Sequence, residues 1–307
     1  MTEPNKGNDT AQTREHTRKF FLKERIEDRI QAVGDSHVGL KRERNEDHYV
    51  IMKRTRTSQI VSSNLPILDL QSGRDEAYAL VVADGIGGAD LGDVASKMAL
   101  ETAIEASEMA TSWLMKFRDF DAQQVQDRVD AYIERIQSRF EDFGQQHPTA
   151  NRMGTTLTCA YIVPPHAIIV QIGDSRAYLF RKGKLEQLTR DHTVQQLLLE
   201  QGIPNERAKK FSNVLLNSLG TTRHDVESEI SNLEMKTGDR LLICSDGLTD
   251  MVSDDAIAQI LSEHTLDEAL DELIKAALAA GGKDNITVIL ADLVEAQTRE
   301  FRQPSES

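Results

Sequence analysis

Residues 77–88 spell AYALVVADGIGG, a run of apolar residues that ends in an acidic residue followed by glycines. Residues 240–247, RLLICSDG, have the same form. A short apolar run bounded by turn residues is typical of a buried β-strand. One aspartate at a strand end is an ordinary turn residue. Five such acidic sites at strand ends, two of them Asp-Gly pairs after apolar runs, are harder to explain as turns alone.

Apolar runs along the rest of the chain predict further strands, and apolar stripes with a period of three or four residues predict helices. The predicted strands are 30–33, 48–52, 77–83, 156–163, 167–172, 177–181, 184–188, 227–235, 240–244 and 286–293. The predicted helices are 95–117, 125–143 and a last block that includes a capping box at 265–268 and stops at 281–282. Hairpin turns such as Lys182-Gly183 and paired helices predict an α+β fold, with antiparallel sheets and the helices outside them.

The chain divides into a polar arm, one folded domain and a short tail. Residues 1–25 and 297–307 carry no apolar period, so we expect them to be flexible, and residues 26–296 form the domain. The polar stretch 53–76 is predicted to be a long loop. Residues 193–222 contain helix-like pieces between strands and form either a flap over a site or a plain connection.

The 307-residue chain is acidic, since 36 Lys and Arg against 50 Asp and Glu give a net charge of −14. Proteins that bind nucleic acid or an anionic membrane normally carry a basic surface, so we expect neither partner. No apolar run approaches the ~18 residues of a spanning helix, and residues 1–25 lack the apolar core of a signal peptide. Cys159 and Cys244 lie in apolar segments, as buried free thiols do, which favours a cytoplasmic location.

Acidic residues stand where apolar strands meet polar turns. The segments are 44–47, 81–85, 172–176, 243–247 and 283–285. Should these strand ends converge, carboxylates ~4 Å apart would repel by about 1 kcal/mol per pair even in water, so a cation would have to hold them together. Carboxylates, water and a main-chain carbonyl exposed by Gly85 are ligands for Mg²⁺ or Mn²⁺, whereas the scattered His and Cys residues have no zinc spacing. One carboxylate shared by two such ions would create a hydrolytic two-metal site.

Arg42 lies four residues before Glu46. On an extended segment its guanidinium would reach the same cleft, where it is a natural bidentate partner of a phosphoryl group. The alternative is a surface arginine within the basic stretch 41–44.

These segments resemble the metal-dependent protein phosphatases of the protein phosphatase 2C type, in the compact form found in bacteria. The resemblance runs in order along nearly all of residues 32–293. It rests on GLKRERNED at 39–47, VADGIGG at 82–88, GDVAS at 92–96, MGTT at 153–156, IGDSR at 172–176, LTRDH at 188–192, CSDGLTD at 244–250 and DNITV at 284–288. Each segment is weak alone, and eight in order are a strong signal.

The resemblance implies two antiparallel sheets stacked face to face and flanked by helix pairs, a four-layer αββα sandwich with a flap insertion. It also implies hydrolysis of phosphoserine and phosphothreonine in proteins by a water that two Mn²⁺ or Mg²⁺ ions activate, with a third, looser ion at Asp174 and Asp246. Asp84 would bridge two metals and Arg42 would bind the substrate phosphate. By position, the implied metal ligands are Glu46, Asp47, Asp84, Gly85, Asp174, Asp246 and Asp284.

The sequence departs from the family pattern near Gly85. Ile86 stands where many eukaryotic relatives have a histidine that acts as general acid, and Ala89-Asp90 replace a commoner His-Asn pair. A water bound to metal is then the expected proton donor. His48 and His192 are near motif residues, and the simpler interpretation of both is a non-catalytic histidine.

Other functions stay open at this point. A kinase is disfavoured because no lysine strand precedes a His-Arg-Asp catalytic loop. A catalytically silent phosphoprotein-binding scaffold on the same fold, or a phosphatase dedicated to one regulatory phosphoprotein such as an anti-sigma-factor antagonist, would carry the same ligands. The expected partners are Ser/Thr-phosphorylated proteins and a cognate Ser/Thr kinase whose action the enzyme reverses.

Overall fold

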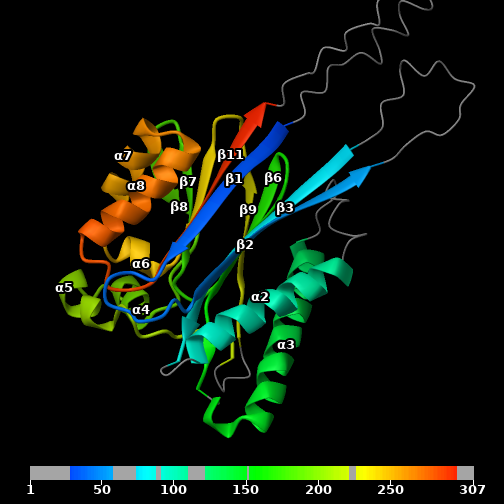
Figure 1. The fold of residues 1–307 in the computed structure, drawn as a ribbon, viewed down its shortest axis with the longest axis vertical. Coiled ribbons are helices and arrows are strands. Elements are labelled where there is room, and N and C mark those ends of the chain that lie inside the picture. Colours follow the sequence, from blue (N-terminus) through cyan, green and yellow to red (C-terminus); the bar gives the residue numbers. More distant parts are fainter. Residues whose placement is uncertain are drawn as a thin grey trace, which may run out of the picture.

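The computed structural model describes residues 28–57, 74–87, 91–109, 122–150, 152–220 and 226–295. The predicted arm and tail lie outside these ranges, as do Ala89, Asp90 and the last part of the predicted helix 95–117. Within the described ranges the chain forms two antiparallel sheets with helices on their outer faces (Figure 1). The predicted α+β sandwich is therefore confirmed.

Neighbouring strands in both sheets run antiparallel to each other. The first sheet has the order β1 (Asp28–His37), β11 (Ile286–Glu295), β10 (Arg240–Cys244), β7 (Arg176–Arg181) and β8 (Lys184–Gln187). The second has the order β2 (Asp47–Thr57), β3 (Arg74–Ile86), β5 (Leu157–Val163), β6 (His166–Ile172) and β9 (Glu229–Glu234), with the short β4 (Gly154–Thr155) paired to β3. Lys182 and Gly183 both have positive φ, as a tight hairpin between β7 and β8 requires.

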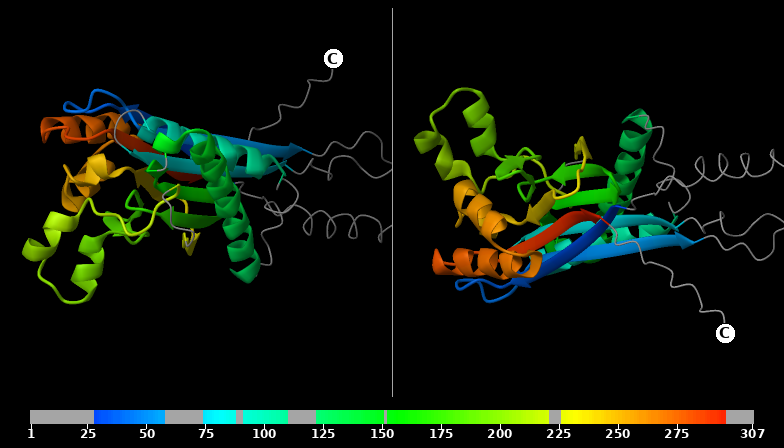
Figure 2. Two further views of the ribbon diagram at one scale, coloured as in Figure 1. Left: turned by 90° about the horizontal axis from the view of Figure 1, so that it is seen from below. Right: turned by 90° about the horizontal axis from the view of Figure 1, so that it is seen from above.

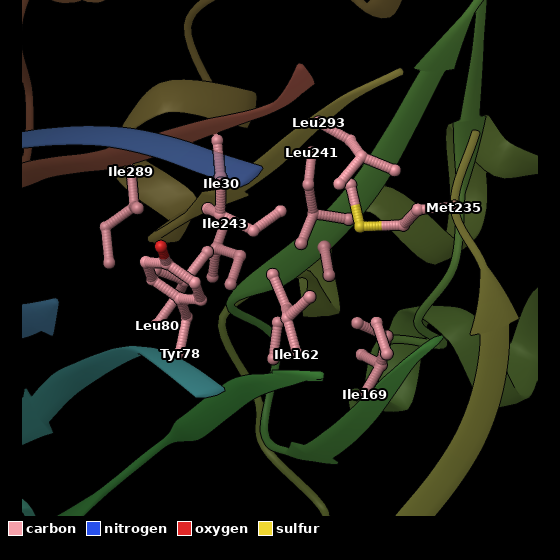
Figure 3. Packing of buried hydrophobic residues seen from close by; sticks show 14 of the residues in the cluster. Ile30, Tyr78, Leu80, Ile162, Ile169, Met235, Leu241, Ile243, Ile289 and Leu293 are labelled. Atoms are coloured by element: carbon pink, nitrogen blue, oxygen red, sulfur yellow. The ribbon is translucent and has the colours of Figure 1, made fainter. Parts of the chain in front are cut away.

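The space between the sheets is the main core of the molecule. Tyr78 and Leu80 of β3 face Ile243 of β10 and Ile289 of β11 across it (Figure 3). β3 is apolar on both faces because its other side packs against helices, which explains the continuous run at 77–83. Burying each large aliphatic side chain contributes about 1.5–3 kcal/mol, so this core fixes how the two sheets are stacked.

Each outer face is covered by a pair of helices, which completes the four layers (Figures 1 and 2). α2 (Leu91–Met109) and α3 (Ala122–Gln146) pack on the second sheet, and α7 (Asp254–Glu263) and α8 (Leu266–Ala279) pack on the first. The predicted stripe of α3 buries Val125, Ile133, Ile136 and Phe140. α8 begins with the predicted capping box, in which Thr265 N donates to Glu268 Oε2 over 3.1 Å.

Both ends of the predicted loop 53–76 are strand in the structure. β2 continues to Thr57 and β3 begins at Arg74, and these two residues pair with each other. Lys53 Nζ lies 2.7 Å from Glu76 Oε2 on the paired strands. These residues are polar because this end of the hairpin extends beyond the core. Residues 58–73 are outside the described ranges.

The connection between β8 and β9 contains two short helices and a 3₁₀ turn. They are α4 (Val194–Glu200), α5 (Asn205–Ala208) and η3 (Lys209–Phe211), which we call the α4–η3 segment. The segment projects from the body of the molecule next to α6 (Asp246–Thr249) (Figures 1 and 2). A bridge between Thr193 and Leu215 closes its base. No helix in the described part of the chain is long and apolar enough to cross a membrane.

Candidate metal centre

The sandwich brings the predicted acidic residues to one end of both sheets. Asp47, the first residue of β2, pairs directly with Asp84 of β3. In the facing sheet Asp246 follows β10 and Asp284 precedes β11, and Asp174 lies between β6 and β7. The charges of the other four residues all act on Asp84, so residues far apart in sequence form one carboxylate cluster.

The carboxylate cluster is electrostatically strained. Burial, followed by the charges of Asp47 and Asp246, raises the pKa of Asp84 well above its usual range. Burial also raises the pKa of Asp47 to about 6. Burial, together with the charge of Asp191, raises the pKa of Asp174 to about 7. Each unit of pKa shift corresponds to about 1.36 kcal/mol, so the negative charges destabilise the fold at neutral pH unless a cation balances them.

Asp47 is held through one of its two oxygens. Its Oδ2 accepts hydrogen bonds from Ser245 Oγ and Thr287 Oγ1, both over 2.7 Å. Its Oδ1 is buried and has no hydrogen-bond partner in the described part of the chain, and the same is true of Oδ1 of Asp246. A buried unpartnered oxygen costs about 1–3 kcal/mol, so two in one cluster indicate that a ligand completes it.

Glu46 is positioned by its main chain. Its N–H donates to Asn285 Oδ1 over 2.8 Å, and its carbonyl accepts from Ser96 Oγ over 2.6 Å and from Gly85 N over 3.2 Å. Asn285 Nδ2 also donates to the carbonyl of Arg44 over 2.9 Å. These bonds fix the loop before β2 against the residue that precedes β11 and against the second turn of α2.

Two glycines allow the backbone to approach closely here. A Cβ at Gly85 would collide with the carbonyl oxygens of Gly92 and Glu46, and a Cβ at Gly92 would lie 2.7 Å from Glu46 Cδ. Any larger residue would therefore push Glu46 or the Gly85 carbonyl away from the cluster.

Arg42 lies at the edge of the carboxylate cluster. Its Nη2 is 2.6 Å from Asp284 Oδ2, and its side chain is 50% exposed. This hydrogen bond is the main cause that raises the pKa of Arg42. The guanidinium thus combines a fixed position with access to solvent, as a group that binds an incoming anion requires.

The two histidines near the motifs have other partners. His48 points to the opposite face of β2 from Asp47, where its Nδ1 lies 2.9 Å from Ser96 Oγ. His192 Nδ1 accepts from Gly173 N over 3.2 Å and lies 3.0 Å from Asn217 Nδ2. Burial lowers the pKa of both residues. Burial raises the pKa of the free thiols of Cys159 and Cys244 to about 12, which disfavours the reactive thiolate at both positions.

The donor set fits a hard divalent cation. It consists of carboxylate oxygens, two of which have no hydrogen-bond partner among the described residues. Among the described residues, no three His, Cys, Asp or Glu side chains are arranged so that they could by themselves hold a metal ion, so waters would have to supply part of the ligand set. Mg²⁺ and similar ions suit such an open arrangement because they keep several of their waters.

Sequence reasoning found the carboxylates but not the groups that hold them. Ser245, Thr287 and Asn285 adjoin the acidic motifs, yet their contacts run to Glu46 and Asp47, more than 190 residues away in the chain. The sequence signal that could have pointed to these three residues is their position next to Asp246 and Asp284 at the same strand ends.

An αββα sandwich with carboxylates gathered at one end of both sheets is the architecture of metal-dependent phosphatase domains. Residues 67–291 match the family model described as protein phosphatase 2C, and the chain belongs to this family.

Named relatives agree with this placement. The chain is 35% identical over 229 residues to the serine/threonine protein phosphatase PstP of Mycobacterium tuberculosis, a match that covers 73% of this chain but only 43% of that protein. It is 36% identical over 223 residues to the serine/threonine phosphatase stp of Listeria monocytogenes, covering 71% of this chain and 86% of that one. The crystal structure of the PstP catalytic domain in complex with two manganese ions aligns with a TM-score of 0.67 and 31% identity, over 87% of this chain and 99% of the other.

Proposed function

We propose that the chain is a metal-dependent protein phosphatase that hydrolyses phosphoserine and phosphothreonine. The observation that carries this proposal is the carboxylate cluster with buried unpartnered oxygens on Asp47 and Asp246, next to the half-exposed guanidinium of Arg42. Relatives at 35–36% identity are named serine/threonine phosphatases, which supports this activity over that of a silent scaffold. Reversal of a bacterial Ser/Thr kinase follows as the proposed biological role.

The residues that would hold metal are the five aspartates of the carboxylate cluster, together with Glu46 and the carbonyl of Gly85. We assign two ions to the core and a third to Asp174 and Asp246. When bound, Mn²⁺ or Mg²⁺ would activate a water as nucleophile and neutralise the phosphoryl oxygens. The proposed ligands are Glu46, Asp47, Asp84, the carbonyl of Gly85, Asp174, Asp246 and Asp284.

The chain's own residues orient the substrate. Arg42 would bind two oxygens of the phosphoryl group, while Asp284 keeps the guanidinium directed at the cluster. Ile86 has no ionisable group, and His48 and His192 bond to Ser96 and Gly173. The serine or threonine alkoxide therefore takes its proton from water. Most of the acceleration would come from positioning and from charge stabilisation.

Hydrolysis of p-nitrophenyl phosphate and of a phosphothreonine peptide in Mn²⁺, with and without chelator, tests the proposal. We expect activity that the chelator abolishes, and Asp84→Asn and Asp246→Asn proteins that fold but lose on the order of 10³-fold in kcat/KM, because several kcal/mol of transition-state stabilisation disappear. Asp271→Asn, at an exposed site on α8, is the matched control and should remain active. Near-normal turnover by Asp84→Asn would refute the assignment.

A further inference from the structure

A cleft of about 470 Å³ separates the α4–η3 segment from the carboxylate cluster. Asp284 and Lys283 lie on one wall, and Asn205, Lys209 and Asn213 lie on the other. The volume is within the range of about 300–1,000 Å³ that is usual for ligand sites in proteins. The cleft begins at the proposed catalytic centre, so a phosphoresidue bound there would place its neighbours between the two walls.

The charges along this cleft differ from those of the whole protein. Asp284 is paired with Arg42, and Arg176 makes two bonds to Asp191, of 2.8 Å and 2.6 Å. Because Asp284 and Arg176 are each paired with an opposite charge, they contribute little net charge to the attraction of a ligand.

Two lining lysines have no such partner. Among the described residues, Lys209 and Lys283 make no ion pair, and Asp250 is the lining carboxylate without one. Burial raises the pKa of Asp250, and the charges of Arg176 and Lys209 oppose that rise, in keeping with the place of all three residues in the lining of one cleft. Two cations against one anion give the cleft a positive excess in a chain whose net charge is −14.

The wall of the α4–η3 segment also offers amide donors. Asn205 Oδ1 accepts from Gln195 Nε2 over 2.9 Å, and Asn213 Oδ1 accepts from Ser212 Oγ over 2.6 Å. Asn205 thus uses its oxygen within the segment, and Asn213, two residues after η3, uses its oxygen on the neighbouring Ser212; neither Nδ2 group donates to a described residue. Free amide donors match the carbonyl oxygens of an extended peptide.

We propose that this cleft binds the part of the substrate chain that adjoins the phosphoresidue, and that Lys209 and Lys283 select substrates with an acidic residue there. The inference rests on the proposed phosphatase function and adds its substrate class. Basic residues in the same place would meet two ammonium groups and bind less well.

The test compares phosphothreonine peptides that differ only in one flanking residue, Glu or Lys, moved stepwise along both sides. We expect the wild-type protein to prefer Glu at one position. Lys209→Gln and Lys283→Gln should each reduce that preference by about twofold to fivefold, the range for an exposed ion pair, and the double variant should abolish it. Lys209 is the decisive site because the α4–η3 segment holds no proposed metal ligand.

Lys210→Gln is the matched control. Lys210 is the next residue of η3, and its ammonium lies 5.0 Å from the ring centre of Phe211 rather than in the cleft. This variant should keep the full preference for Glu. Lys210→Gln should also hydrolyse p-nitrophenyl phosphate at the wild-type rate. The effect of Lys209→Gln and Lys283→Gln is measured as the ratio of kcat/KM for the Glu and Lys peptides, which a general loss of activity does not change.

Two results would overturn the inference while the phosphatase function stands. One is equal kcat/KM for Glu and Lys peptides at every position, and the other is an unchanged preference in the double variant. A protein that hydrolyses neither peptide nor p-nitrophenyl phosphate would instead overturn the proposed function. Fluorescence anisotropy of the same labelled peptides then decides the role of the cleft: tighter binding of the Glu peptide supports it, and equal binding contradicts it.

Discussion

Replacing Asp47 by Asn should stabilise the metal-free protein at neutral pH. Burial raises the pKa of Asp47 from 3.8 to about 6. A shift of about two units corresponds to about 3 kcal/mol of unfavourable free energy when the folded protein carries this charge. Asparagine keeps an oxygen that accepts from Ser245 and Thr287, and it places an amide group where Oδ1 had no partner. Removal of the charge should therefore raise Tm by about 6–12 °C in the presence of a chelator.

The effect has a defined pH window. The folded protein binds this proton more tightly than the unfolded chain, so stability is lost as pH rises from the unfolded pKa of 3.8 to the folded value of about 6. Above pH 6 the folded protein carries the full unfavourable free energy of the charged Asp47, and below the window Asp47 is protonated and this cost is absent. The Tm difference between Asp47→Asn and wild type should be constant above pH 6, narrow below it, and nearly vanish by about pH 4.

Thermal unfolding followed by circular dichroism, in chelator and in Mn²⁺, measures both effects. Mn²⁺ should reverse the order, because the wild-type carboxylate is then compensated and the variant lacks a ligand. Asp292→Asn is a useful control: Asp292 is bonded to Arg240 Nε over 2.7 Å, far from the cluster, and its loss should destabilise the protein under both conditions. An Asp47→Asn protein no more stable than wild type in chelator at neutral pH would refute the electrostatic argument.

Two further substitutions test the groups around the cluster. Arg42→Ala removes a charge-assisted contact worth about 1.5–3 kcal/mol, so kcat/KM for p-nitrophenyl phosphate should fall by roughly 10–100-fold, mostly through KM; an unchanged KM would return Arg42 to the role of a surface residue. Ser96→Ala removes the 2.6 Å hydrogen bond to the Glu46 carbonyl. Loss of such a supporting contact typically costs 10–100-fold in metal affinity, so the Mn²⁺ concentration for half-maximal activity should rise while the rate at saturating Mn²⁺ recovers. An unaltered Mn²⁺ requirement would show that α2 does not position Glu46.

The layers of the fold could be predicted because their signals are local. The run 77–83 is apolar throughout, since β3 is covered on both faces. The stripe of α3 repeats at the helical period because one face packs on the second sheet. The ends of β2 and β3 could not be predicted, because residues such as Lys53 and Glu76 are polar and their strand conformation comes from the pairing of β2 with β3.

Part of the site could be predicted from the sequence because its signals, like those of the layers, are local. Asp84 and Asp246 each precede a glycine at the end of an apolar strand, which marks them within a few residues. The clamp made by Asn285 joins segments separated by 239 residues, and no local pattern records it. Such contacts exist only once the two sheets have stacked.

The pairing of β1 with β11 has a consequence for protein engineering. Asp28 lies opposite Glu295, at the far end of these strands from Asp284 (Figure 1). Ten-residue strands place that end roughly 30 Å away from the carboxylate cluster. A short linker that joins residues 28 and 295 in a circular permutant would therefore lie far from the cleft. In the unpermuted chain, a reporter protein fused near either residue would not block the approach of a substrate protein to the cleft.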